Sequence, residues 1–417
     1  MFYVIQGALR GERPRDVARR STIIGVVSFL TLIDLFGSQA LLPQLIVAFE
    51  ADPGLMGFAV NASTLGMAAS SLVIAWFADR IDRKRGIWIS LALLSIPTVC
   101  LGLTDDVWVF MGLRIAQGVC MAAAFTLTMT YLSEQCDITA TGGALAAYIT
   151  GNVLSNLVGR LLAVSAADLT GLSGSFFTFA ALNLLGAVVA FVLIGPKDDA
   201  KSAPTDYGSP WVAWKFHLGT GEVRATFFIG FIILFAFVGV FTYVNLHLVD
   251  VLGLSPMSLG LVYLVFIPAV ITTPLAANLV RVQGPQKTMV GALALSLVAL
   301  GLTLVPSLWF VLPGLAIFGA AIFFAQAAAT GFLSAVVQRD NAAASGLYLT
   351  SYYLGGLAGS LLLGIMGAAD SWPIAAVTVS GSLLIAIALA WRLEPISQKM
   401  REQVSDHMRY QHSPHDD

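Results

Sequence analysis

The hydrophobic residues of this chain are gathered into long runs, and short polar stretches separate them. A helix needs roughly 20 apolar residues to cross the hydrocarbon core of a bilayer, and twelve runs are about that long. No small-residue cleavage site follows the first run, so we interpret it as a retained helix rather than a signal peptide. The pattern predicts transmembrane helices over residues 22–46, 55–78, 87–104, 107–131, 144–165, 174–195, 225–248, 257–279, 288–306, 309–332, 346–368 and 373–391.

One long polar stretch divides these runs into two groups of six. We interpret it as a linker, and we expect its aromatic, lysine-bearing piece at 211–217 to lie at the membrane interface. An all-α membrane protein of two six-helix bundles is therefore predicted. Its parts are a cytoplasmic segment 1–21, an N-terminal bundle 22–195, a cytoplasmic linker 196–223, a C-terminal bundle 224–392 and a cytoplasmic tail 393–417.

The composition agrees with a membrane protein. Of the 417 residues, 57% are hydrophobic and 11% are charged, whereas soluble domains carry about 25% charged residues. A net charge of −2 gives no reason to expect a nucleic-acid partner. The cysteines, Cys100, Cys120 and Cys136, lack metal-ligand spacing. We also find no nucleotide-binding signature, so we predict no cofactor, no metal and no use of ATP.

The basic residues give the predicted helices a direction. If the N-terminus is cytoplasmic, all but two of the 22 Lys and Arg residues fall on the inner side, and the exceptions, Arg114 and Arg160, lie inside helices. The outer loops carry acidic residues instead: Glu50, Asp52, Asp105, Asp106, Asp168, Asp250 and Asp370. The positive-inside rule therefore predicts an even number of spans, with both termini in the cytoplasm.

The two predicted halves resemble each other in sequence. Residues 148–160 (YITGNVLSNLVGR) match residues 348–360 (YLTSYYLGGLAGS) at five of thirteen positions, at an offset of 200, and GLRIA at 112 matches GLAIF at 314. These matches predict parallel repeats, with substrate bound between them near the bilayer midplane. The repeat places Ala316 opposite Arg114 and Ser360 opposite Arg160. The charged residues that act in transport are therefore expected in the N-terminal half. The C-terminal half is expected to shape the cavity and to supply aromatic contacts.

Three short motifs resemble signatures of the major facilitator superfamily. Residues 75–84 (AWFADRIDRK) resemble its loop signature G-x-L-x-D-R-x-G-R-K, although Ala75 and Asp82 replace two glycines. Residues 114–122 (RIAQGVCMA) are similar to the R-x-x-Q-G-x-x-x-A motif of proton-coupled members. Residues 151–160 look like a degraded form of the antiporter signature G-x-x-x-G-P-x-x-G-G, and their spacing resembles an arabinose-efflux-like bacterial branch near the drug:proton antiporters.

The resemblance implies a monomeric secondary transporter in a bacterial inner membrane. Its halves would rock to alternate access to a cavity lined by helices 1, 2, 4, 5, 7, 8, 10 and 11, and it would export a small organic molecule in exchange for protons. A proton-coupled uptake symporter is the first alternative, because the sequence barely separates the two directions. A multi-pass membrane enzyme is the second, but one buried acid and no intramembrane histidine pair leave little for such a site.

The resemblance also implies a gating loop after the second helix. Asp79 would meet the positive amino end of the eleventh helix near Ser345 and hold the inner gate shut. The second half has Val280 at the corresponding place. The alternative is that the basic cluster only keeps the loop in the cytoplasm. The other predicted members of the gating loop are Arg80, Arg83 and Lys84.

Three charged residues inside predicted helices mark the candidate site. Asp34 is the one carboxylate in a predicted span, about 18 Å deep at 1.5 Å per residue. Intramembrane charges are costly and commonly mark pathways or proton relays. We predict that Asp34 binds the proton with Arg114 as its partner, since low dielectric favours the neutral acid and a nearby arginine favours the carboxylate. Arg160, with Arg114, would bind or gate anionic groups. Each could instead be a packing tie, and Arg160 could snorkel outward.

Polar residues on the cavity-lining helices complete the predicted substrate site. Hydrogen bonds between neighbouring spans would explain each of them equally well. The candidates, besides Arg160, are Gln39, Asn152, Asn156, Gln326, Tyr348 and Tyr352.

Overall fold

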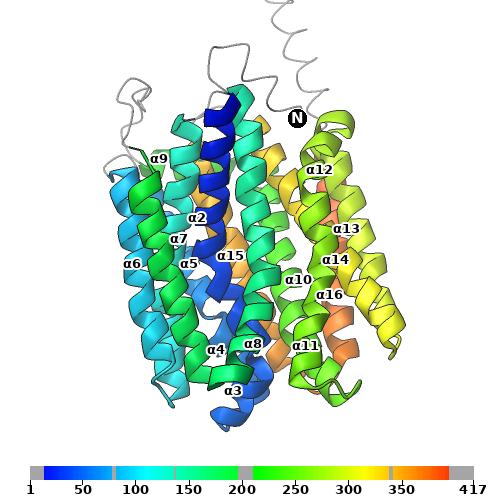
Figure 1. Cartoon of the computed structure of the whole chain (residues 1–417). Helices are drawn as coiled ribbons and strands as arrows, with labels where there is room; N and C mark the ends of the chain where they lie inside the picture. Colours follow the sequence, from blue (N-terminus) through cyan, green and yellow to red (C-terminus); the bar gives the residue numbers. More distant parts are fainter. Residues whose placement is uncertain (1–13, 78–80, 136–137, 196–209, 338–340, 394–417) are drawn as a thin grey trace, which may run out of the picture.

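A computed structural model gives the fold of this chain, and it describes residues 14–77, 81–135, 138–195, 210–337 and 341–393. Every regular element within those residues is helical. Figure 1 shows the long helices running roughly side by side, with the first half of the sequence forming one bundle and the second half the other. The predicted fold class, an all-α protein of two helical bundles, is therefore confirmed.

The N-terminal half contains α2 to α8. Its helices are α2 (Pro14–Ala40), α3 (Leu42–Ala48), α4 (Pro53–Asn61), α5 (Ser63–Phe77), α6 (Arg83–Leu101), α7 (Val107–Gln135) and α8 (Ile138–Leu193). The range of α8 contains two antiparallel helices, because Gly171 interrupts it with φ 77° and ψ 174°. A backbone with positive φ is open to glycine at little steric cost. The predicted fifth and sixth spans therefore meet at a single residue. The sequence pattern predicts a connection over 166–173, and the observed connection is shorter.

The C-terminal half follows a short helix, α9 (Pro210–Gly219). Its helices are α10 (Gly221–Asp250), α11 (Pro256–Val262), the 3-10 helix η4 (Tyr263–Phe266), α12 (Ile267–Gln283), α13 (Pro285–Leu302), α14 (Leu308–Val336), α15 (Asn341–Ile365) and α16 (Trp372–Arg392). The eighth predicted span is thus built from α11, η4 and α12, with a short 3-10 stretch in the middle of the span. Such a stretch inside a helix often marks a hinge.

Two helices begin earlier than predicted because an aspartate caps each of them. The Asp82 carboxylate accepts from the Arg85 N–H at 2.7 Å, so α6 starts at Arg83 rather than at 87. Asp52 accepts from the Leu55 N–H at 2.9 Å, and α4 starts at Pro53 rather than at 55. A side-chain oxygen at this position satisfies an amide that the helix leaves unpaired. Asp82, which departs from the family loop signature, thus acts as a helix cap.

The described helices are consistent with the twelve predicted spans. Nine stretches of the described residues are long and apolar enough to cross a membrane, and one of them, Ala147–Leu193, contains the two helices on either side of Gly171. The eighth span is absent from these nine because its apolar stretch within the described residues, Ser258–Thr273, is too short to be counted. The eleventh, α15, is absent too, and its three tyrosines lower its mean hydropathy.

The internal sequence repeat is also a structural repeat. In the first half, a Cβ on Gly159 would lie 2.3 Å from the carbonyl oxygen of Ile33, so α8 touches the backbone of α2. In the second half, a Cβ on Gly359 would lie 2.4 Å from the carbonyl oxygen of Phe235, so α15 touches α10 in the same way. Both pairs are related by the offsets of about 200 that the sequence shows. The repeat is therefore one of backbone packing.

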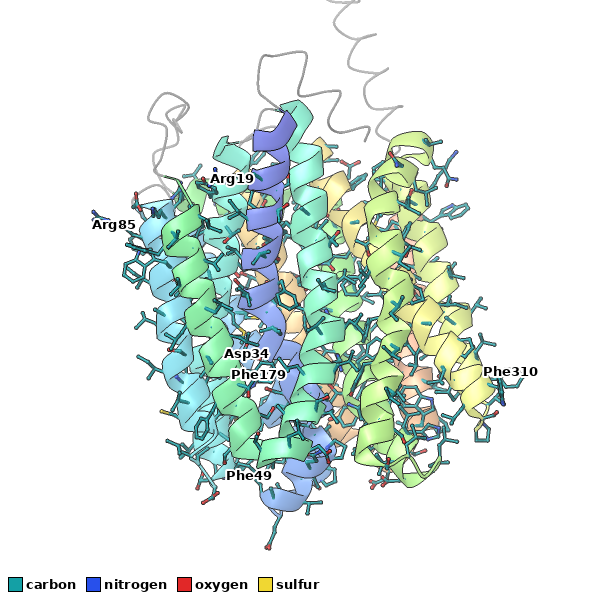
Figure 2. All side chains as sticks on the ribbon, viewed as in Figure 1. Arg19, Asp34, Phe49, Arg85, Phe179 and Phe310 are labelled. Atoms are coloured by element: carbon teal, nitrogen blue, oxygen red, sulfur yellow. The ribbon has the colours of Figure 1, made fainter. Side chains whose placement is uncertain are left out.

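The two bundles meet along several helices. α15 packs against α4 and α5, while α11 and α12 pack against α8. At the end of the molecule near α3, the backbones come very close, because a Cβ on Gly364 would lie 3.2 Å from Cα of Gly54. Figure 2 places Phe49 at this end and Arg19 and Arg85 at the opposite one. The separation of Arg19 and Arg85 from Phe49 agrees with the predicted basic inner side.

Candidate functional site

Asp34 lies inside the N-terminal bundle. It is 1% exposed, and Figure 2 places it between the end that carries Arg19 and the end that carries Phe49. Its Oδ2 accepts hydrogen bonds from three neighbouring helices: from Thr98 of α6 at 3.3 Å, Gln117 of α7 at 3.1 Å and Asn183 of α8 at 3.2 Å. Its other oxygen, Oδ1, has no hydrogen-bond partner within the described residues.

Arg114 lies next to this carboxylate and is fully buried. Its guanidinium donates to Gln117 Oε1 at 2.6 Å, to the Val60 carbonyl at 2.8 Å, to Ser63 Oγ at 3.1 Å and to the Leu35 carbonyl at 3.4 Å. Gln117 accepts from Arg114 and donates to Asp34, so it bridges the two charged groups. The predicted partners are thus joined through an amide.

The arrangement allows Asp34 to gain or lose a proton with little rearrangement. A proton on Oδ1 would leave the three hydrogen bonds to Oδ2 in place. Burial in low dielectric favours the neutral acid, and the positive charge of Arg114 favours the carboxylate. Opposing influences of this kind make the protonation state sensitive to small changes in the surroundings.

A second polar network joins the two halves. Gln39 of α2 donates to Asn61 Oδ1 at 2.7 Å, and its backbone carbonyl accepts from Asn245 of α10 at 3.1 Å. Asn61 in turn donates to Thr242 Oγ1 at 3.0 Å, and the Tyr263 hydroxyl donates to Asn245 Oδ1 at 2.7 Å. These contacts tie α2 and α4 of one bundle to α10 and η4 of the other.

Arg160 of α8 is part of this second network. Its Nη2 donates to Gln39 Oε1 at 2.5 Å, and within the described part of the chain its Nε and Nη1 have no hydrogen-bond partner. Four aromatic rings surround it, with centroids at 4.9 Å (Tyr263), 5.3 Å (Phe241), 5.4 Å (Phe266) and 5.8 Å (Phe36) from its Cζ. The side chain is fully buried, so the alternative that Arg160 snorkels to the membrane surface is wrong.

A narrow cavity of about 30 Å³ lies between the halves, beside the second network. That is the share of one water molecule in the liquid, so the halves must separate before an organic molecule can enter. Four predicted residues line the cavity: Gln39, Asn152, Gln326 and Tyr352. Asn156 and Tyr348 lie outside its lining: Asn156 donates to the Asn152 carbonyl at 3.3 Å, and Tyr348 stacks on Tyr352 at 6.1 Å between ring centroids.

The sequence profile of the Major Facilitator Superfamily matches residues 24–281. The chain belongs to this superfamily. It is a multi-pass membrane transporter, and its nearly all-helical structure agrees with that assignment.

Curated relatives match this transporter along most of its length. An uncharacterized transporter of Buchnera aphidicola subsp. Baizongia pistaciae is 25% identical over 374 residues, which cover 88% of this chain and 92% of the relative. The uncharacterized MFS-type transporter YybF of Bacillus subtilis is 23% identical over 87% of this chain and 90% of its own. The inner membrane transport protein YnfM of Escherichia coli is 24% identical over 86% of each chain.

Solved structures share the fold of this transporter. A bacterial homolog of the human lysosomal transporter Spinster, in an inward-facing and unoccupied conformation, matches with a TM-score of 0.70 and 16% identity, over 92% of this chain and 95% of that one. The same protein in an occupied conformation matches with a TM-score of 0.68. At this identity the likeness concerns the fold alone.

The predicted gating loop is described only in part. Asp79 and Arg80 lie outside the described residues, and so does the predicted contact of Asp79 with the amino end of the eleventh helix. Arg83 is buried, and its Nη1 donates to the Ile81 carbonyl at 2.9 Å. Lys84 places its Nζ 5.5 Å from the centroid of the Phe191 ring.

Several residues of the two networks are missing from the sequence prediction. Asn183 and Asn245 each stand within a long apolar run, and an isolated amide in such a run indicates a hydrogen bond between helices. Gln117 belongs to the proton-coupled motif, but the motif alone does not show that it bridges two charges. Thr98 and Tyr263 have no comparable signal.

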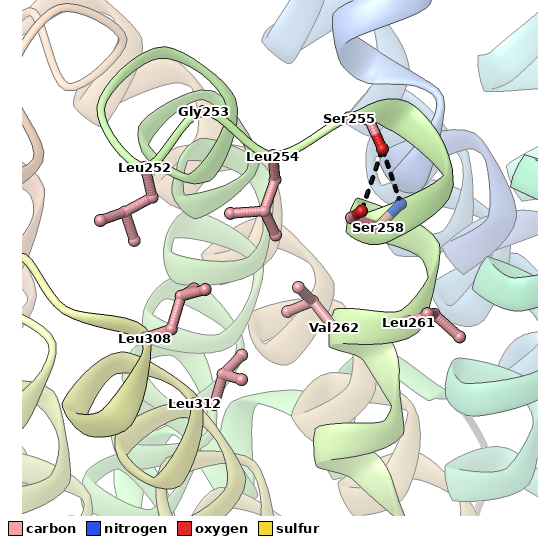
Figure 3. Close-up of a pocket in the computed structure, with 9 residues that line it drawn as sticks. All are labelled: Leu252, Gly253, Leu254, Ser255, Ser258, Leu261, Val262, Leu308 and Leu312. Atoms are coloured by element: carbon pink, nitrogen blue, oxygen red, sulfur yellow. Dashed lines mark hydrogen bonds between the residues drawn. The ribbon is translucent and has the colours of Figure 1, made fainter.

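The transporter also has an apolar groove at the end where α11 begins, and its lining includes Val262, the residue before Tyr263 of the second network. Figure 3 shows it between the α10–α11 loop and α14, and its lining residues are Leu252, Gly253, Leu254, Ser255, Ser258, Leu261, Val262, Leu308 and Leu312. Ser255 Oγ accepts from the Ser258 N–H at 3.3 Å and contacts its hydroxyl at 2.9 Å, which caps α11. With its polar atoms used in this way, the groove offers little chemistry for a substrate.

Proposed function

We propose that this transporter is a proton-coupled exporter of a small organic molecule, with Asp34 as the proton site. The observation that carries the proposal is a buried carboxylate with one free oxygen, held through Gln117 to a buried arginine. In a bilayer such a group is costly unless it has a function. The resemblance to the arabinose-efflux-like branch favours export over uptake.

The proton site and the substrate cavity lie on opposite faces of α2. Leu32, Phe36 and Gln39 face the cavity, whereas Asp34 contacts α6, α7 and α8. Arg114 connects the two faces, because it donates to the backbone carbonyl of Leu35, which lines the cavity. A proton on Asp34 would weaken the attraction for Arg114 and loosen the hold of α7 on α2. Protonation would in this way change the position of the cavity wall without contact between proton and substrate.

Export in exchange for protons predicts a definite energetic coupling. Binding of a proton from the outer side favours the state from which Asp34 can reach the cytoplasm, and the substrate moves outward on the return step. A ligand can shift the equilibrium between the two states of a carrier only by the difference in its affinity for those states. In this transporter the difference would lie in whether Arg114 stays close enough to stabilise the Asp34 carboxylate.

The test uses purified protein in liposomes that contain a pH-sensitive dye. A panel of small organic molecules is added with and without an imposed pH gradient, and proton flux and substrate flux are recorded together. Opposite movement of proton and substrate is the expected result. Movement of both in one direction would replace export by proton-coupled uptake, and transport with no proton flux would remove the proton from the mechanism.

A further inference from the structure

Arg160 is a buried cation, and none of its contacts among the described residues is an acidic side chain. Its side chain has no exposed area, and the described contacts of its guanidinium are Gln39 and four aromatic rings. Burial of an unpaired charge is strongly unfavourable. Ring faces return part of that energy through cation–π attraction. A neutral amide is a weaker acceptor than a carboxylate, which receives the strongest hydrogen bonds that a guanidinium makes.

The unused donors of Arg160 suit a carboxylate. A guanidinium has five N–H groups in a planar fork. Within the described residues that of Arg160 donates through Nη2 to Gln39 and also has a side-chain hydrogen bond with Tyr263. Nε and Nη1 stay without partners among the described residues. Each of them shares an edge of the fork with Nη2, so a carboxylate can be held by two parallel hydrogen bonds on either edge once Gln39 moves aside.

The cavity between the halves lies beside this arginine, although Arg160 is not one of its lining residues. Phe36 and Gln39 contact Arg160 and also line the cavity, so these two side chains lie between the cavity and the guanidinium. The remaining lining is apolar, aromatic, hydroxyl or amide: Leu32, Leu35, Thr64, Met67, Phe125, Asn152, Leu234, Val238, Gln326, Leu349, Tyr352 and Tyr353. None of these residues carries a charge.

We infer that Arg160 binds the carboxylate of a monoanionic substrate, whose apolar alkyl or aryl body lies in the cavity. The inference rests on the proposed function, in which this cavity carries the substrate. One cation pairs with one carboxylate, whereas a dicarboxylate would bring a second, unpaired charge into the cavity. A cationic substrate would meet Arg160 and no acidic side chain among the lining residues.

The 3-10 stretch of the eighth span, η4, can open access to Arg160 for the substrate. Tyr263 and Phe266 cover the guanidinium, and both belong to η4 of the C-terminal half, whereas Arg160 belongs to the N-terminal half. When the halves rock apart, these two rings withdraw from Arg160 and leave its donors open. The aromatic rings thus hold the charge while the cavity is closed, and the substrate carboxylate replaces them when it opens.

The test compares size-matched probes on the purified full-length protein. Benzoate, benzamide, benzylammonium and hexanoate are added in turn, and the thermal midpoint of unfolding is measured. Benzoate and hexanoate should raise the midpoint in a concentration-dependent way, and benzamide and benzylammonium should not. In Arg160→Gln the effect of both carboxylates should be lost, and in Arg160→Lys it should be partly kept. Ser360→Ala, at the repeat position, should respond like the native protein.

A second variant keeps the test decisive if Arg160→Gln does not fold. Gln39→Glu gives Arg160 a carboxylate partner within the chain, at the loss of the hydrogen bond from Gln39 Nε2 to Asn61 Oδ1, and it should remove the response to benzoate. The inference is overturned if no carboxylate stabilises the native protein, if the amide or the amine does so equally, or if either variant keeps the response. Loss of proton coupling in the liposome assay would leave these binding results unchanged, so the two proposals can fail separately.

Discussion

The two halves of this transporter share a backbone and differ in chemistry. Gly37 lies against Gly159 in the first half as Gly239 lies against Gly359 in the second, at sequence offsets of 202 and 200. At the same offsets, the positions of the charged network hold small apolar residues in the C-terminal half. Ala236 stands for Asp34, Ala316 for Arg114 and Gly319 for Gln117.

Aromatic rings fill this region of the C-terminal half. Phe237 and Phe241 have ring centroids 4.9 Å apart, Phe241 and Phe266 are 4.6 Å apart, and Phe237 and Phe323 are 5.4 Å apart. Packed cores of this kind resist deformation. One half therefore carries a buried carboxylate and two buried arginines, and the other presents packed aromatic rings at the matching positions.

The largest expected effect is the loss of proton coupling in Asp34→Asn. The amide oxygen of asparagine can still accept from Thr98, Gln117 and Asn183, so the variant should insert and fold normally. It cannot exchange a proton, so transport driven by a pH gradient in proteoliposomes should fall to the level of empty liposomes. Exchange between equal substrate pools should survive, because it needs no net proton movement.

The repeat supplies the control for this prediction. Ala236→Ser alters the matching position of the C-terminal half, and its hydroxyl can bond to the carbonyl one turn earlier in the helix. Gradient-driven transport should persist in this variant. If Asp34→Asn liposomes accumulate substrate against a pH gradient at the native rate, the proton must ride on the substrate or on another residue.

The second prediction concerns the arginine of the same network. Arg114→Leu leaves Gln117, Ser63 and two backbone carbonyls without their donor, and removal of one member of a buried charged network costs about 3–5 kcal/mol. We expect a lower thermal midpoint and damaged coupled transport. Ala316→Ser, at the repeat position, should change stability by less than about 1 kcal/mol. Equal damage from both substitutions would contradict the view that charge handling lies in one half.

The third prediction tests the shared backbone rather than the differing chemistry. Gly159→Ala and Gly359→Ala each place a methyl group within 2.4 Å of a carbonyl oxygen on the facing helix. Overpacking of this kind costs about 1–3 kcal/mol, so both variants should unfold at lower temperature and by similar amounts. Thermal unfolding of the purified variants measures this. A large effect in only one half would mean that the packing repeat is less regular than the backbone contacts indicate.

Much of the fold could be predicted from the sequence because a bilayer allows few structures. Apolar runs of the right length must be helices, and the match between 148–160 and 348–360 already indicates the repeated packing of α8 and α15. The errors occurred at helix ends, where single residues decide. Asp52 and Asp82 cap helices earlier than the apolar pattern begins, and Gly171 alone separates two spans.

The candidate site was harder to predict, since hydrophobic patterning does not show which residues face each other. The burial of Asp34, Arg114 and Arg160 follows from their positions in apolar runs, and the structure places all three in the interior. The role of Gln117 as a bridge depends on the rotation of α7 relative to α2. The cage around Arg160 depends on the position of η4, and the sequence pattern of the eighth run does not reveal this 3-10 stretch.

The smallest expected effect concerns the loop after the second helix. This loop carries an acidic residue, Asp79, whereas the corresponding position of the second half is Val280. A carboxylate near a helix N-terminus contributes about 0.3–1 kcal/mol, so Asp79→Asn should shift the balance of inward- and outward-facing states by a few-fold without preventing insertion. Val280→Ala, at the repeat position, removes no charge and should shift nothing. A cysteine at Leu349, which lines the cavity, can report the shift in a background without Cys100, Cys120 and Cys136. Its labelling should become faster from the inner side and slower from the outer side in Asp79→Asn, because the inner gate has lost its latch. Equal labelling rates in both backgrounds would reduce the loop to a signal of membrane orientation.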